Sequence, residues 1–95
     1  MEDTDILIEE LLDTDLESDV SDPAYLIVHN DEFNTFEWVI ECFKKVLKHT
    51  SEQAEQLAYI IHFKGKATVK AGPMDTLRPY KDALCERGLG AVIEQ

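Results

Sequence analysis

Charge is divided so unevenly along this chain that only its later part is expected to fold around a core. Residues 1–24 hold ten of the twenty acidic residues of the 95-residue sequence and contain no Lys, Arg or aromatic residue. A segment of this composition buries too little apolar surface to offset the entropy cost of ordering. We therefore predict a disordered, flexible acidic extension over residues 1–24 and a single small domain over residues 25–95.

The extension also contains apolar residues at roughly helical spacing. Two interpretations remain open: a segment that folds only against a groove of a partner, or a solvated leader in which a short amphipathic match arises by chance. The apolar residues concerned are Ile6, Leu7, Ile8, Leu11, Leu12 and Leu16.

The formal charge of −11 limits the choice of partners and compartment. After residue 24 the chain has ten acidic and nine basic residues, so nucleic acid is not expected and basic protein surfaces are favoured. Cys42 and Cys85 form no CxxC pair, which suits the cytoplasm better than a disulfide-bonded, secreted protein. Neither a signal peptide nor a run of about 18 apolar residues is present, so no membrane association is expected.

Two cap signals predict the first two helices. Asn34 stands three residues before Glu37, and Thr50 stands three residues before Gln53, which is the spacing of a capping box. The expected helices cover about residues 35–48 and 51–62.

Glycine and proline limit the other elements. Gly65 is expected to stop the second helix. Pro79 is tolerated near the first turn of a helix and breaks a helix interior, so the third helix is expected to begin late. Its expected start is Asp75 or Thr76, and its expected end is Gly88 or Gly90.

Three short segments are typical of strands: "YLIV" at residues 25–28, "KATVKAG" at 66–72 and "AVIEQ" at 91–95. The second of them alternates, with Lys66, Thr68 and Lys70 on one side. The order β-α-α-β-α-β predicts a small α+β domain, in which a three-stranded antiparallel sheet is covered by helices on one face.

Enzymatic chemistry is not supported by the local context of the candidate residues. The sequence has no nucleophile elbow and no Gly-rich phosphate loop, and Cys42 has no evident cationic neighbour. We therefore expect a protein that is not an enzyme and needs no cofactor. The candidates weighed are His29, Asp31, Glu32, Cys42 and His62.

A metal site is an alternative for the same region. His29, Asp31 and Glu32 are ligand types that a metal accepts, and His62 could join them from the second helix. Neighbouring residues of a strand point to opposite faces, however, so these side chains converge only if the loop bends specially.

Recognition of an amine is the third interpretation of this region. A carboxylate, an amide oxygen and an unprotonated imidazole nitrogen are all acceptors, and together they satisfy the N–H donors of a cationic amino group. The acceptors are Asn30, Asp31, Glu32 and His62, and the apolar wall beside them is Phe36, Val39 and Ile61. The pattern alone favours a plainer interpretation, in which Asn30 and Asp31 are turn residues and His62 is placed to favour the helix dipole.

Two longer stretches carry a family resemblance. "LIVHNDEFNTFEWVIECF", followed at a suitable interval by "QAEQLAYIIHFKGKATV", resembles the ClpS adaptor family, with its Asn-Asp-Asp motif and its His-x-x-Gly-Lys-Ala motif. The resemblance covers residues 25–95. It implies an adaptor that binds proteins with bulky hydrophobic N-terminal residues (Leu, Phe, Tyr or Trp) and delivers them to a ClpA-type or ClpC-type AAA+ unfoldase working with the ClpP peptidase.

The resemblance also implies roles for single residues. Asn30, Glu32 and His62 would hold the α-amino group, with Asp31 at the mouth of the pocket. The residues implied to line the side-chain pocket are Asn34, Phe36, Val39, Ala58, Ile61 and Leu89, and those implied to face the unfoldase are Lys66 and Asp75. The extension would serve delivery rather than binding.

Five positions depart from the pattern of that family. Glu32 replaces an Asp, Asn34 and Thr35 replace the usual Thr-Pro, and Phe36 and Ala58 stand where Met is frequent. A large ring gained and a long side chain lost roughly conserve the pocket volume but change its shape. The expected protein is thus a monomeric adaptor of unknown residue preference. Its rival is a docking module of similar fold, resembling the C-terminal domain of the ribosomal stalk protein, in which Asn30 and His62 are incidental.

Overall fold

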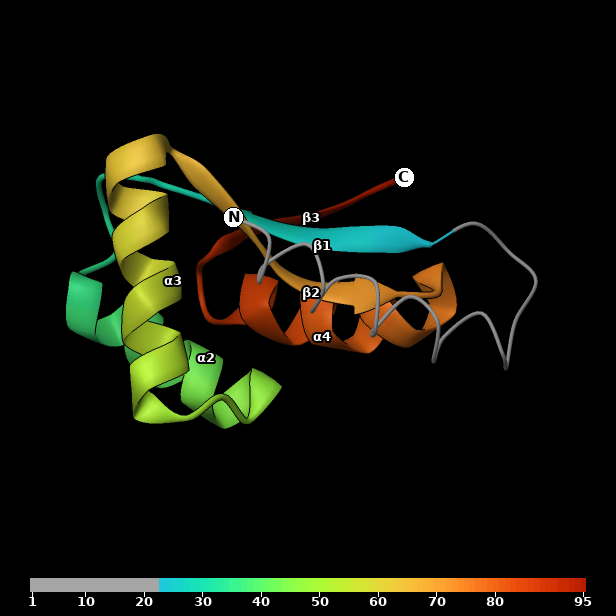
Figure 1. Cartoon of the computed structure of the whole chain (residues 1–95), viewed down its shortest axis with the longest axis horizontal. Coiled ribbons are helices and arrows are strands. Elements are labelled where there is room, and N and C mark those ends of the chain that lie inside the picture. Colours follow the sequence, from blue (N-terminus) through green and yellow to red (C-terminus); the bar gives the residue numbers. More distant parts are fainter. Residues whose placement is uncertain (1–22) are drawn as a thin grey trace, which may run out of the picture.

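The computed structural model describes residues 23–95, and the predicted disorder of the extension lies outside these residues except at its last two positions (Figure 1). The described elements follow the predicted order β-α-α-β-α-β. They are β1 (Ala24–His29), α2 (Phe36–Leu47), α3 (Ser51–Lys64), β2 (Lys66–Gly72), α4 (Met74–Glu86) and β3 (Gly90–Glu94). Ala24 begins β1 and is fully buried, so the folded domain begins at least one residue earlier than predicted.

The three strands form one antiparallel sheet in the order β2-β1-β3, as predicted. The register shifts within the β1–β2 pair: Leu26 pairs with Lys70 but Ile27 pairs with Thr68, which leaves Val69 as an extra residue in β2. Lys70 therefore shares the face of Leu26 instead of the face of Thr68, contrary to the simple alternation expected. Its Nζ lies over the ring of Tyr80, 5.0 Å from the ring centroid.

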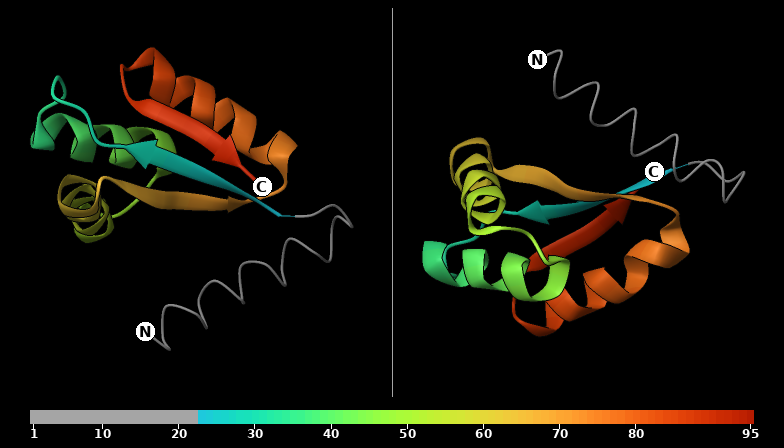
Figure 2. Two further views of the ribbon diagram at one scale, coloured as in Figure 1. Left: turned by 90° about the horizontal axis from the view of Figure 1, so that it is seen from above. Right: turned by 60° about the horizontal axis from the view of Figure 1, so that its bottom comes forward.

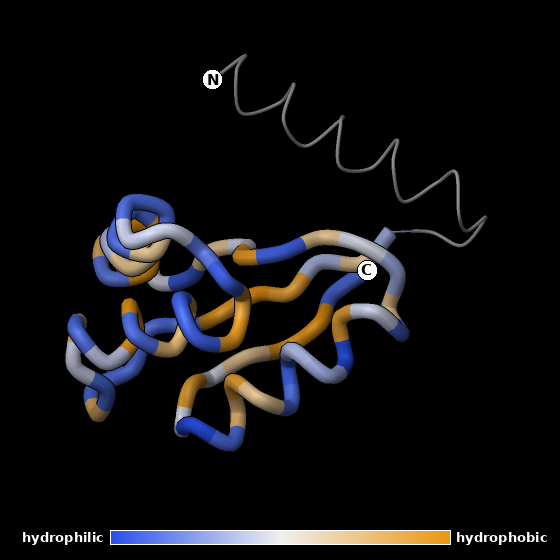
Figure 3. Tube along the Cα trace, turned by 90° about the horizontal axis from the view of Figure 1, so that it is seen from below, coloured by the Kyte–Doolittle hydropathy of each residue, from blue (hydrophilic) through white to orange (hydrophobic). Residues whose placement is uncertain are grey.

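All three helices lie on one face of the sheet (Figure 2). α4 runs beneath β3 and β1, while α2 and α3 pack against each other at the end where β2 begins. Buried residues from the sheet and from α2, α3 and α4 form one hydrophobic cluster, and the tube coloured by hydropathy shows hydrophobic stretches along the strands and on parts of the helices (Figure 3). The largest fully buried side chains are Phe43, Leu26, Leu77, Leu84, Val28 and Cys42.

The two predicted capping boxes have different outcomes. At α3 the prediction is confirmed: the Gln53 N–H donates to Thr50 Oγ1 at 3.1 Å, and the Thr50 N–H donates to Gln53 Oε1 at 3.0 Å. At α2 it is wrong, because Thr35 is the cap and accepts from the Trp38 N–H at 3.0 Å. The Asn34 side chain is engaged elsewhere, so the adjacent Thr35 hydroxyl takes this position.

Two helix boundaries also differ from the predicted ones. α3 continues to Lys64 and ends, as expected, at Gly65, whose φ of 94° suits glycine. α4 begins at Met74, which places Pro79 inside the helix rather than near its first turn. Pro79 has no N–H to donate to the carbonyl of Asp75, but both residues are exposed, so water can satisfy that carbonyl.

Candidate functional site

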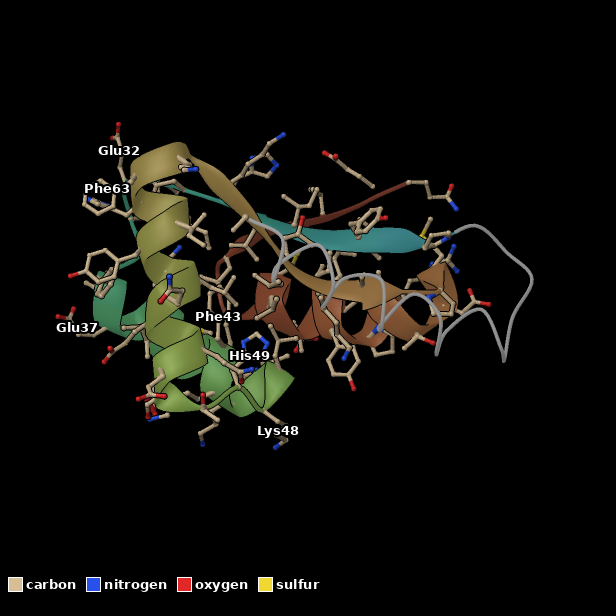
Figure 4. The ribbon with its side chains drawn as sticks, viewed as in Figure 1. Glu32, Glu37, Phe43, Lys48, His49 and Phe63 are labelled. Atoms are coloured by element: carbon tan, nitrogen blue, oxygen red, sulfur yellow. The ribbon has the colours of Figure 1, made fainter. Side chains whose placement is uncertain are left out.

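A pocket of about 570 Å³ opens between the loop that follows β1 and the facing sides of α2 and α3. Glu32 from the loop and Phe63 from α3 lie at the same end of the molecule, close to the last turn of α3 (Figure 4). The residues that line the pocket are Asn30, Asp31, Glu32, Asn34, Phe36, Val39, Ala58, Tyr59, Ile61, His62 and Phe63. Nine of these eleven residues were predicted from the sequence, so the fold brings together one polar loop and two helix faces that are distant in the chain.

Asp31 holds the shape of the loop. Its Oδ1 accepts hydrogen bonds from the N–H groups of Phe33 and Asn34, each at 2.8 Å, and its Oδ2 accepts one from Asn34 Nδ2 at 2.7 Å. The pKa of Asp31 is lowered, chiefly by the N–H of Asn34, and burial opposes this shift without reversing it. Asp31 is therefore an anion whose two oxygens are already used within the loop, which leaves it little capacity to accept from a ligand.

Two further hydrogen bonds fix the loop against the rest of the domain. The N–H of Asn30 donates to the carbonyl of Gly65 at 2.8 Å, which joins the end of β1 to the end of α3. Asn34 Nδ2 donates to the carbonyl of Gly88 at 2.9 Å, which joins the loop to the turn after α4. The polar side of the pocket is thus held at both ends, and Asn34 serves as a tie as well as a lining residue.

The acceptors of the polar end come from both sides of the pocket. Asn30 and Glu32 lie on the loop and His62 lies on the last turn of α3, and all three are exposed to solvent. Among the described residues, no hydrogen bond or ion pair engages these three side chains. Their oxygen and nitrogen atoms are therefore available to a ligand.

The apolar end is built from the inner faces of two helices. Phe36 and Val39 line it from α2, and Ala58 and Ile61 line it from α3. Ala58 is only 3% exposed, so a longer side chain at this position would project into the space between the helices. The small Ala58 side chain leaves room in the pocket, which the Phe36 ring lines from the opposite helix.

Tyr59 and Phe63 also line the pocket but were missed by the sequence analysis. Their rings stack nearly parallel, with centroids 5.7 Å apart, and Tyr59 meets Phe36 edge-on at 5.1 Å. A signal was present in the sequence, because residues four apart share one face of a helix and these two flank the predicted His62.

Other predicted residues lie away from the pocket. Leu89 does not line it, because this side chain is buried in the main core. Lys66 begins β2 opposite His29, and Asp75 lies on the first turn of α4, where it pairs with Arg78 at 3.5 Å. The role of these two residues towards an unfoldase stays a prediction.

The metal alternative gains no support from the geometry. Within residues 23–95, no three His, Cys, Asp or Glu side chains are grouped as a metal ion would need. His29 does not line the pocket, so the loop does not bring the four proposed ligands together.

The described helices also include none that is long and apolar enough to cross a membrane.

Comparison with known proteins places this chain in a family. The sequence profile described as "ATP-dependent Clp protease adaptor protein ClpS" matches residues 20–90. A ClpS adapter protein from Thermosynechococcus vestitus is 39% identical over 69 residues, which are 70% of this chain and 73% of the relative. One from Synechocystis is 38% identical over 65 residues, which are 67% of this chain and 66% of the relative.

The fold agrees with these sequence matches. The structure of Agrobacterium tumefaciens ClpS2 bound to L-phenylalaninamide superimposes with a TM-score of 0.70 at 20% sequence identity, and covers 76% of this chain and 94% of that one. The protein is therefore of the class of protease adaptors. More particularly, the chain belongs to the ClpS family, whose members are adaptors of the ATP-dependent Clp protease.

Proposed function

We propose that this chain captures proteins by a free α-amino group and a bulky hydrophobic first residue, and that it delivers them to a ClpA-type or ClpC-type AAA+ unfoldase working with ClpP. The observation that carries the proposal is the pocket itself, which has free acceptors at one end and an apolar slot at the other. The proposal assigns binding and not catalysis to the site. It also assigns the chain to the cytoplasm, in keeping with its free cysteines.

The acceptors match a cationic amine in number and kind. Asn30 Oδ1, the Glu32 carboxylate and an unprotonated His62 nitrogen would each take one of its three N–H donors. Asp31 contributes its negative charge at the mouth of the pocket rather than a hydrogen bond, since its two oxygens already accept hydrogen bonds within the loop. Hydrogen bonds to a charged group contribute about 1.5–3 kcal/mol each when well made.

The apolar slot matches one large side chain. Four apolar residues line it: Phe36, Val39, Ala58 and Ile61. Burying an aromatic or leucine side chain there contributes about 1.5–3 kcal/mol. After the entropy of association is subtracted, the sum is compatible with affinity of about micromolar Kd.

A solved relative supports this use of the pocket. Agrobacterium tumefaciens ClpS2 has been solved bound to L-phenylalaninamide. That ligand carries a free α-amino group on a phenylalanine side chain, which is the combination that the two ends of the pocket would accept here.

Fluorescence anisotropy with short peptides tests the proposal directly. The purified full chain is titrated into peptides that differ only at residue one (Phe, Leu, Trp, Tyr or Ser), each with a free and an acetylated N-terminus. Peptides with a free bulky N-terminus should bind, and acetylation should weaken binding at least tenfold because it removes the charge and two of the three donors. Equal binding of the acetylated peptides would overturn the amine assignment.

Two substitutions separate this function from that of a plain docking module. His62→Ala and Asn30→Ala should each weaken capture of the Phe peptide about tenfold or more, with the fold retained, because both side chains are exposed. His29→Ala is the matched control, since His29 is an exposed histidine of the same region that does not line the pocket. Loss of binding in the control alone would contradict the proposed site.

A further inference from the structure

Four aromatic rings form a continuous row along one side of the pocket. Phe36 meets Tyr59 edge-on with centroids 5.1 Å apart, Tyr59 stacks on Phe63 at 5.7 Å, and Phe63 meets His62 edge-on at 5.1 Å. The row therefore runs from the apolar slot at Phe36 to the amine end at His62. The slot for the first side chain needs only its Phe36 end.

The two middle rings are exposed, which distinguishes them from apolar residues that hold the fold. Tyr59 is 55% exposed and Phe63 is 73% exposed, although both line the pocket. Their contacts with each other and with their neighbours fix the orientation of the rings while much of their surface remains uncovered. Fixed, exposed aromatic rings of this kind provide contact area at a low entropic cost.

The dimensions leave space for more than one side chain. A volume of about 570 Å³ lies in the middle of the range of about 300–1,000 Å³ that holds a drug-sized ligand. An extended peptide advances about 3.3–3.6 Å per residue. Residues two and three of a bound chain would thus come within reach of rings that follow one another at 5.1 and 5.7 Å.

We propose that Tyr59 and Phe63 form a second subsite, which takes a flat side chain, an aromatic ring or a guanidinium group, from residue two or three of the captured chain. This inference rests on the proposed function. Aromatic faces favour such groups through offset stacking and cation–π contact. Asp31 and Glu32 on the opposite rim add attraction for a guanidinium group and repel an acidic side chain.

The test is a peptide panel with a free N-terminal Phe in every member. Residue two, and in a second series residue three, is Trp, Arg, Ser or Asp, and anisotropy gives the Kd for the full chain. In at least one series the Trp and Arg peptides should bind about three to ten times more tightly than the Ser peptide, and the Asp peptide should bind most weakly.

Phe63→Ala identifies the surface responsible. In this variant the Trp and Arg peptides should bind no better than the Ser peptides. Tyr59→Ala should show the same loss. Phe33→Ala is the matched control, because Phe33 is 91% exposed but does not line the pocket, and it should keep the preference.

Failure of the subsite and failure of the proposed function give different results. If all Phe-initiated peptides bind equally whatever follows residue one, or if Phe63→Ala keeps the preference, the second subsite is wrong and the N-terminal capture stands. If no Phe-initiated peptide binds, including the Ser members, both proposals are wrong.

Discussion

Helices α3 and α4 have 14 and 13 residues and lie on the same side of one sheet, yet they place their large apolar residues differently. α4 buries Leu77 and Leu84 completely, whereas α3 buries Ala54, Ala58 and Ile61 but leaves the larger Tyr59 and Phe63 exposed. Folding alone explains the inward side chains of α4. It does not explain the exposed rings on α3, and this difference is a reason for proposing the α2–α3 end as the binding surface.

The largest expected effect is on the α4 side. Leu84→Ala should lower the free energy of unfolding by about 2–5 kcal/mol, because a fully buried leucine leaves both lost contacts and a cavity. Urea unfolding followed by circular dichroism measures this value. A loss below about 1 kcal/mol would mean that α4 is not the tightly packed side of the comparison.

An intermediate effect is expected in the loop that borders the pocket. Asp31→Ala removes the acceptor of three hydrogen bonds from Phe33 and Asn34, and it should cost about 1 kcal/mol of stability, because the net contribution of hydrogen bonds in a partly exposed loop is modest. Peptide affinity should fall as well, because the loop that carries Asn30 and Glu32 loses its shape. Asp31→Asn keeps one acceptor oxygen. Its stability in urea unfolding and its peptide affinity in anisotropy should therefore lie between those of Asp31→Ala and those of the unmodified chain.

A smaller effect on stability, which depends on pH, is expected from the partly buried His49. Burial, and secondarily the charge of Lys70, lower the pKa of His49, whose Nδ1 is buried without a partner in the described residues. The unfolded chain therefore binds a proton more readily than the folded chain, so stability should fall as the pH drops through the ordinary value of 6.5.

His49→Phe isolates this contribution. Thermal unfolding between pH 7.5 and 5 should show a shallower loss of stability in the variant than in the unmodified chain. The Asp31 carboxylate does not contribute to the change in stability between pH 7.5 and 5, because its pKa lies below the ordinary value of 3.8 and its stabilisation is lost only at more acidic pH. Identical pH profiles would exclude His49 as the source.

The smallest effect on stability is expected from the exposed rings. Phe63→Ala should change the free energy of unfolding by no more than about 0.5 kcal/mol, since the side chain is largely in water. The contrast with Leu84→Ala is the sharpest form of the comparison between the two helices. A loss of several kcal/mol in urea unfolding would show instead that the ring row is part of the core.

The order of the elements and the sheet were predictable because they follow from local patterns. Cap, glycine and proline signals located the three helices, and Thr50 with Gln53 located the start of α3 correctly. The start of α2 was misjudged because Asn34 and Thr35 are both good caps. The choice between them depends on Gly88, which lies 54 residues away in the sequence.

Long-range contacts also explain what was missed in the sheet and in the pocket. Periodicity placed Lys70 on the same face of the sheet as Thr68. The extra residue Val69 moves Lys70 to the opposite face, and no local signal revealed this change. Leu89 was assigned to the pocket by resemblance, but packing places it in the core. The spacing of Tyr59 and Phe63 placed them on one face of the helix, but it did not show that the packing of α2 against α3 leaves this face at the pocket.

The hydrogen bond from the Asn30 N–H to the Gly65 carbonyl involves main-chain atoms only. The spacing between the loop and the end of α3 is therefore set without the help of any side chain that meets a ligand. Glu32 is exposed, so its side chain can be exchanged without removing this bond. Under the proposed function, the domain would be a starting scaffold for engineering reagents that sort peptides by their first residue.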